Sequence, residues 1–145
     1  MDGQTEYFDM DVDDSAAPWL ANDMDQRIEQ LEALSGLTAV ELWSQKLSGR
    51  QVWLYTDNEI AFRVLQKGWS PTPYLAQMAA HFWLTALTQN VCIWLDVVAS
   101  KANIADGPSR REYLHVKPSW RRLQQPKVPQ LREWSYWFQR PMADI

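Results

Sequence analysis

The sequence predicts an α/β fold in which a small sheet is flanked by helices. Two short apolar segments, 52–55 and 91–97, have the composition of buried strands, and they alternate with three stretches of helical periodicity. Alternating strands and helices are typical of a layered fold in which neighbouring strands pair in parallel. With 145 residues, of which 46% are hydrophobic, the chain is long enough for one domain with a buried core and terminal tails.

The first helix is predicted over residues 26–47. Its inward stripe recurs at helical spacing and consists of Ile28, Leu31, Leu34, Ser35, Thr38 and Leu42. Asn22, Asp23 and Asp25 are candidate caps for its start, and Ser48-Gly49 is expected to end it. The acidic segment 1–25 ahead of it is expected to be only partly ordered, with a possible short edge strand where apolar residues alternate with aspartates at 8–12.

The remaining elements follow in order along the chain. After the strand at 52–55, a helix capped by Asp57-Asn58 is expected to run to Lys67 and to end at Gly68. A further helix opens at Thr72-Pro73 and runs to about residue 89. The strand at 91–97 then leads through a polar connection into a short helix around Asp106.

Charge separates the two ends of the chain. Residues 1–32 hold ten acids and one base, whereas residues 110–145 hold eight bases and three acids. The organisation predicted is an acidic segment at 1–25, a domain at 26–112 and a basic tail or linker at 113–145 that contains proline and tryptophan. Pro118, Pro126 and Pro129 argue against regular structure in that tail.

Composition limits the class of protein. A single cysteine, Cys92, excludes an internal disulfide framework and favours a reducing, intracellular compartment, the cytoplasm or the nucleus. The sequence has no apolar run long enough to span a membrane and no basic segment followed by an apolar one, so we expect neither a membrane partner nor a signal peptide. Trp53, on the first predicted strand, and Cys92 and Trp94, on the second, are expected to be buried. His81 is expected to pack or to lie at the surface rather than to catalyse.

Three carboxylates stand at comparable places in these elements. Glu32 lies on the first helix, Asp57 follows the first strand, and Asp106 lies in the turn beyond the second. Each has an ordinary alternative explanation, because Asp57 and Asp106 occupy cap or turn positions and Glu32 is common on a flanking helix. Together they form the oxygen-rich set that Mg²⁺ or Mn²⁺ prefers, and parallel sheets place such groups at one strand edge.

The joint pattern resembles a known family. Three segments carry the resemblance: residues 28–34, then Val52-Trp53-Leu54-Tyr55-Thr56-Asp57-Asn58 leading to residue 70, then Asn103-Ile104-Ala105-Asp106-Gly107-Pro108-Ser109-Arg110. In this order and spacing they resemble the ribonuclease H-like domain of retroelement reverse transcriptases, particularly the tyrosine-recombinase-bearing, DIRS-like elements. The resemblance covers about residues 5–112.

The resemblance implies roles for particular residues. Glu32, Asp57 and Asp106 correspond to catalytic metal ligands. Asn58, Asn103, Ser109 and Arg110 correspond to positions that support the site or face the nucleic acid, and Trp69 is a candidate for stacking on a base. The chain departs from the family in two ways: the first two strands, with the aspartate that bridges both metals, have no counterpart, and residues 98–105 contain no histidine. The family's sheet would therefore be truncated at its N-terminal side.

Two functions follow as expectations. The first is hydrolysis of the RNA strand of RNA–DNA hybrids by two Mg²⁺ or Mn²⁺ ions, impaired by loss of the first aspartate, in a polyprotein with an upstream reverse transcriptase domain. The second is an inactive, retroelement-derived module that binds nucleic acid or a protein partner. An α/β domain whose acids are only caps is the third possibility.

Overall fold

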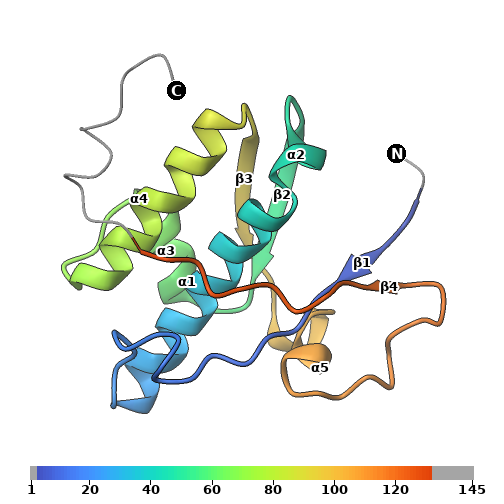
Figure 1. The fold of residues 1–145 in the computed structure, drawn as a ribbon, viewed down its shortest axis with the longest axis horizontal. Helices are drawn as coiled ribbons and strands as arrows, with labels where there is room; N and C mark the ends of the chain where they lie inside the picture. Colours follow the sequence, from blue (N-terminus) through green and yellow to red (C-terminus); the bar gives the residue numbers. More distant parts are fainter. Residues whose placement is uncertain (1–2, 132–145) are drawn as a thin grey trace.

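The computed structural model describes residues 3–131 as a mixed α/β arrangement (Figure 1). Its two long strands, β2 (Gln51–Thr56) and β3 (Cys92–Val97), pair in parallel from Gln51 opposite Cys92 to Thr56 opposite Val97. The helices are α1 (Met24–Leu42), α2 (Ser44–Leu47), α3 (Glu59–Lys67), α4 (Pro73–Thr88) and α5 (Asp106–Ser109), with a 3₁₀ turn at Ser100–Ala102. The expected parallel pairing of the two strands is confirmed.

Local signals set the helix boundaries. The side chain of Asp23 accepts the backbone N–H of Gln26 at 3.0 Å and starts α1, while Asn58 accepts the N–H of Ala61 at 2.8 Å and starts α3. Gly68 ends α3 with φ of 69°, a left-handed conformation that costs glycine little. The expected single helix at 26–47 is interrupted at Trp43, so it forms α1 and α2.

The core lies between one face of the sheet and α1, α3 and α4. Its fully buried large side chains are Phe82, Leu34, Leu37, Leu65 and Met78. Trp83 joins two of the helices, because its indole N–H donates to the carbonyl of Leu65 at 2.6 Å. None of the helices within residues 3–131 has the length and apolar content needed to cross a membrane.

The opposite face of the sheet is exposed, and here three expectations were wrong. Trp53 is 59% exposed, Trp94 is 51% exposed, and Cys92 is exposed as well. The two indole rings stack on each other with centroids 5.9 Å apart. Apolar runs predict strands buried on both faces, but helices cover only one face of this sheet in the described part of the chain. His81, for which packing and surface roles were both open, is buried.

A second, smaller sheet joins the two ends of the described chain. Strand β1 (Glu6–Tyr7) pairs in parallel with β4 (Arg121–Arg122). The expected strand at 8–12 is therefore displaced to Glu6–Tyr7. The prolines of the tail do not prevent regular structure at 121–122, and Val128 and Leu131 pack against the core. Residues 113–131 are thus part of the folded unit, while 132–145 lie outside the described residues.

Candidate functional site

Glu32 is the central acid of the candidate site. It lies midway along α1, on the side that faces the end of β2, and its carboxylate accepts a long hydrogen bond, 3.5 Å, from the hydroxyl of Thr56. Thr56 is the last residue of β2 and is buried. The contact fixes the helix acid at the carboxyl end of the strand, where parallel sheets commonly place their functional groups.

Asp57 follows Thr56 directly, at the exit of β2. The cap of α3 is its neighbour Asn58, whose side chain is occupied by the N–H of Ala61 and whose own N–H donates to the hydroxyl of Thr56 at 3.2 Å. Asn58 therefore has a structural role as a cap. Because Asn58 provides this cap, the carboxylate of Asp57 is not needed to start the helix, and the cap explanation for Asp57 is weakened.

Asp106 begins α5, in the turn beyond β3. The turn is held by its own side chains: Asn103 accepts the N–H of Ala105 at 3.0 Å, and the hydroxyl of Ser109 donates to the carbonyl of Asp106 at 2.7 Å. Arg110 lies 3.4 Å from the carboxylate of Asp106, one helical turn away. Asn103, Ser109 and Arg110 thus position the third acid, and this arrangement is consistent with a supporting role.

The three acids share one electrostatic environment. Burial raises the pKa of Glu32 above its ordinary value of 4.5, and the negative charges of Asp57 and Asp106 raise it further, against the hydrogen bond from Thr56. Coulombic repulsion of this kind requires proximity. A helix, a strand exit and a distant turn therefore bring their carboxylates to the same end of the β2–β3 sheet.

The three acids do not form a ready-made metal centre in this structure. Within residues 3–131, no three acidic, histidine or cysteine side chains form a group that could hold a metal ion. The donor chemistry suits a hard cation, since the set is made of carboxylate, hydroxyl and amide oxygens.

Comparison with known proteins identifies no relative. No protein-family model, no curated protein and no solved structure matches this chain. Any assignment of function therefore depends on the geometry of the site itself.

Trp69, the proposed stacking residue, is 61% exposed and follows the cap of α3. Its exposure leaves an aromatic face open to a ligand. Within residues 3–131 no hydrogen bond or ion pair joins Trp69 to the three acids, so its role in the site stays a prediction.

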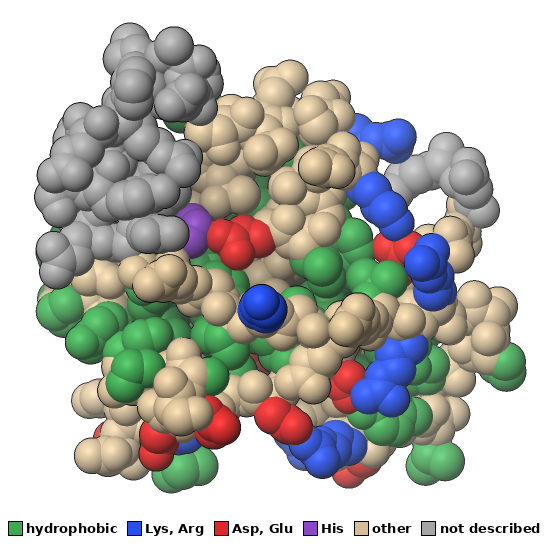
Figure 2. All heavy atoms as spheres, in the orientation of Figure 1, with side chains coloured by type: hydrophobic (Ala, Val, Ile, Leu, Met, Phe, Trp, Pro, Cys, Tyr) green, Lys and Arg blue, Asp and Glu red, His purple; other side chains and the backbone are tan. Residues whose placement is uncertain are grey.

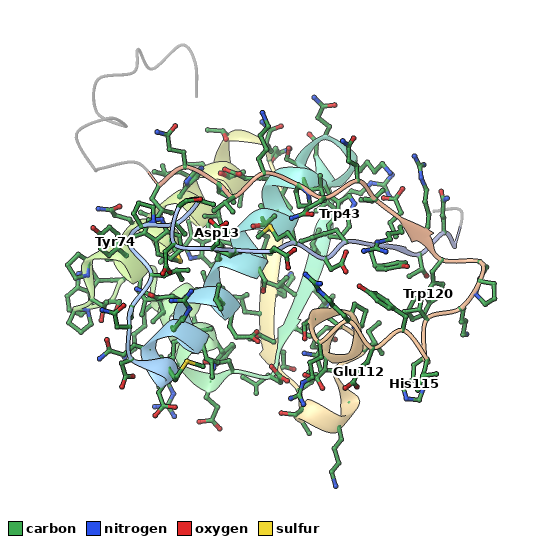
Figure 3. All side chains as sticks on the ribbon, turned by 60° about the horizontal axis from the view of Figure 1, so that its bottom comes forward. Asp13, Trp43, Tyr74, Glu112, His115 and Trp120 are labelled. Atoms are coloured by element: carbon green, nitrogen blue, oxygen red, sulfur yellow. The ribbon has the colours of Figure 1, made fainter. Side chains whose placement is uncertain are left out.

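Sequence reasoning missed a set of ion pairs between the two ends of the chain. Glu6 accepts hydrogen bonds from Lys46 at 2.7 Å and from the indole of Trp43 at 3.0 Å, and Arg121 lies 3.7 Å away. Figure 3 shows Trp43 beside the N-terminal segment, with Glu112, His115 and Trp120 along the chain from α5 to β4. We call residues 5–12 together with 111–123 the terminal clamp.

Asp9 and Asp11 extend the terminal clamp. Asp9 accepts hydrogen bonds from Arg122, at 2.8 Å and 3.0 Å, and from the hydroxyl of Tyr113, while Asp11 pairs with Arg111. Burial alone would raise the pKa of Asp9, but the hydrogen bonds from Tyr113 and Arg122 lower it overall. The opposite charges of the two ends, visible in the sequence, were the signal for this pairing. Figure 2 shows acidic and basic side chains interspersed on this side of the molecule.

Proposed function

We propose that this chain is a ribonuclease H-like domain of a retroelement reverse transcriptase, which acts on the RNA strand of RNA–DNA hybrids. The observation that carries the proposal is the position of Glu32 at the carboxyl end of β2, where its carboxylate accepts a hydrogen bond from Thr56, the neighbour of Asp57. At this place burial and then the charges of Asp57 and Asp106 raise the pKa of Glu32. Carboxylates that repel one another are costly to the fold, and perturbed acids of this kind are concentrated at functional sites. The parallel strands that deliver the acids support the same proposal.

The cofactor in this proposal is Mg²⁺ or Mn²⁺, held by Glu32, Asp57 and Asp106, which supplies charge stabilisation for phosphodiester hydrolysis. Other residues of the chain hold the three acids in position. Thr56 orients Glu32, Asn58 anchors the exit of β2, and the turn from Asn103 to Arg110 presents Asp106. An upstream reverse transcriptase domain in the same polyprotein would deliver the hybrid.

A second candidate function is nucleic-acid binding without cleavage. It is favoured by one observation: within residues 3–131 no acidic, histidine or cysteine side chains form a ready-made group for a metal ion. In this case the proposed ligand is again an RNA–DNA hybrid or another nucleic acid.

Thermal unfolding with and without Mn²⁺, combined with a hybrid-cleavage assay, tests the proposal. A cation that binds the native state stabilises it by about 1.4 kcal/mol at ten times its dissociation constant. We expect Mn²⁺ to stabilise the wild-type chain and to stabilise the Asp57→Asn variant much less. Cleavage of the RNA strand should be weak and should be lost in Asp57→Asn.

Asp25→Asn is the matched control, because Asp25 is an exposed acid in the first turn of α1 and lies outside the site. It should respond to Mn²⁺ as the wild type does. Hybrid binding without a Mn²⁺ effect or cleavage would favour the second function. Equal Mn²⁺ stabilisation of wild type and Asp57→Asn would remove the proposed metal ligands.

A further inference from the structure

One carboxylate of the terminal clamp is held by two donors from the tail. Asp9 accepts two hydrogen bonds from Nη2 of Arg122, at 2.8 Å and 3.0 Å, and a third from the hydroxyl of Tyr113. The guanidinium of Arg122 also lies over the ring of Tyr113, 5.3 Å from the ring centre. The side chain of Asp9 is only 19% exposed, so its neighbours enclose most of it.

Arg111 brings a second guanidinium to the same part of the clamp. It pairs with Asp11, whose hydrogen bond and charge raise the pKa of Arg111. The charge of Asp9 raises this pKa further, so the two pairs lie within electrostatic reach of each other. Arg111 has φ of 59°, a left-handed conformation that glycine or asparagine usually adopts after a helix. The turn therefore costs an arginine backbone energy, and the contacts of its side chain offset that cost.

These donors suit a phosphodiester as well as a carboxylate. Both anions carry one negative charge that is shared by two oxygens, and guanidinium and hydroxyl groups donate hydrogen bonds to either. The side chains of Arg111 and Arg122 are 68% and 56% exposed. A phosphate can therefore reach both guanidinium groups from solvent while the core of the chain stays folded.

The same donors line the groove that contains part of the candidate site. This groove, of about 950 Å³, is lined by Asp9, Arg111 and Arg122 from the clamp and by Glu32 and Asp106 from the site. Figure 2 shows basic side chains gathered at the right of the view, on the side where Figure 1 shows β1, β4 and α5. A nucleic-acid strand with a phosphate on these arginines would therefore run past the acids.

We propose that Arg111, Tyr113 and Arg122 form a binding site for the backbone phosphates of a nucleic-acid strand, and that Asp9 and Asp11 occupy this site in the free chain. The acidic segment is then an internal competitor, because a strand gains these contacts only when its phosphates displace the two carboxylates. The choice of a nucleic acid as ligand rests on the proposed function. The site itself requires neither a metal ion nor cleavage, so a binding assay without divalent cations tests it separately from Mn²⁺ stabilisation.

The test compares one arginine change in two backgrounds. Fluorescence anisotropy of a labelled single-stranded oligonucleotide gives the dissociation constant at fixed ionic strength without divalent cations. Asp9→Asn/Asp11→Asn removes the competitor, and we expect about five-fold tighter binding, the combined effect of two exposed ion pairs. Arg111→Gln/Arg122→Gln should then weaken binding about five-fold more in this background than in the wild type, because the wild-type arginines are already occupied.

Lys117→Gln/Lys127→Gln is the matched control, because it removes the same charge from two exposed positions of the tail. It should weaken binding equally in both backgrounds. The side chain of Asp11 is 73% exposed, so Asp11→Asn alone, combined with Arg111→Gln, repeats the comparison with little effect on folding.

Two results would overturn the proposal. The first is an arginine change that weakens binding equally in the two backgrounds, since the aspartates would then not compete for the site. The second is release of the oligonucleotide by inorganic phosphate at the same concentration of phosphate groups, with ionic strength held constant by KCl. The ligand would in that case be free phosphate and not a nucleic-acid strand.

Discussion

Nucleic-acid binding by this chain should depend weakly on salt, because ion pairs already neutralise most of the bases in the described part of the tail, residues 110–131. The described tail holds six bases: Arg110, Arg111, Lys117, Arg121, Arg122 and Lys127. Four of them pair with acids, namely Arg110 with Asp106, Arg111 with Asp11, Arg121 with Glu6 and Arg122 with Asp9. Within residues 3–131 only Lys117 and Lys127 of this set lack an ion pair.

The magnitude follows from the number of phosphates that the tail can neutralise. On single-stranded DNA each neutralised phosphate contributes about −0.7 to the slope of log affinity against log salt, so Lys117 and Lys127 contribute about −1.4. Arg132 and Arg140, outside the described residues, have the same charge in every variant. The double variant Asp9→Asn/Asp11→Asn releases two arginines, and the slope should steepen by about a further 1.4 relative to wild type. The affinity of this double variant for the oligonucleotide at low salt should also be higher than that of the wild type.

Fluorescence anisotropy with a labelled single-stranded oligonucleotide, titrated over a series of KCl concentrations, measures the slope. Asp25→Asn/Glu29→Gln is the matched control, because it changes net charge by the same amount and neither acid has an ion pair in the described structure. We expect its slope to stay near the wild-type value. If both double variants steepen the slope equally, net charge rather than release of the arginines is responsible. If neither variant changes it, the tail does not contact phosphate.

Two further predictions concern stability. The pKa of Glu32 is raised in the folded state. The stability contributed by its protonated form is therefore complete below its ordinary pKa of 4.5 and is lost as pH rises through the folded pKa. Glu32→Gln should therefore be more stable than wild type at pH 7 but not at pH 4. Urea titrations without divalent cations measure this difference. An equal effect of the substitution at both pH values would contradict this reasoning. Trp83→Phe removes the hydrogen bond to Leu65 and should cost about 1 kcal/mol, measured by urea unfolding, whereas Trp69→Phe, at an exposed site, should cost less than about 0.5 kcal/mol.

The order and type of the central elements could be predicted because local signals agreed with tertiary packing. Caps at Asp23 and Asn58 and the left-handed Gly68 set the helix boundaries, and the short apolar strands paired in parallel as expected. The approach of Glu32 to Asp57 and Asp106 also follows from that topology, since parallel strands end at the same edge. Whether the three carboxylates bind a metal stays a prediction.

What the sequence could not show depends on contacts between distant segments. The apolar sequences of these two strands do not show whether helices cover one face of the sheet or both. The exposure of Trp53, Trp94 and Cys92 could therefore not be predicted from the sequence. Likewise, prolines argue against regular structure locally, but they do not prevent two residues between them from pairing with a remote strand. To predict the terminal clamp, one would have to know which acid pairs with which base, and counts of charged residues do not give these pairs.

The terminal clamp also has a consequence for how the chain folds. Residues 24–97 contain α1 to β3, and the paired residues Gln51 and Cys92 of the two strands in this range are 92 − 51 = 41 positions apart. In contrast, Glu6 pairs with Arg121, which is 121 − 6 = 115 positions away. Closing a loop of that length costs chain entropy before any pairing is gained, and distant pairings slow folding. The helical core should therefore assemble first, and the two charged ends should meet last, guided by their opposite charge.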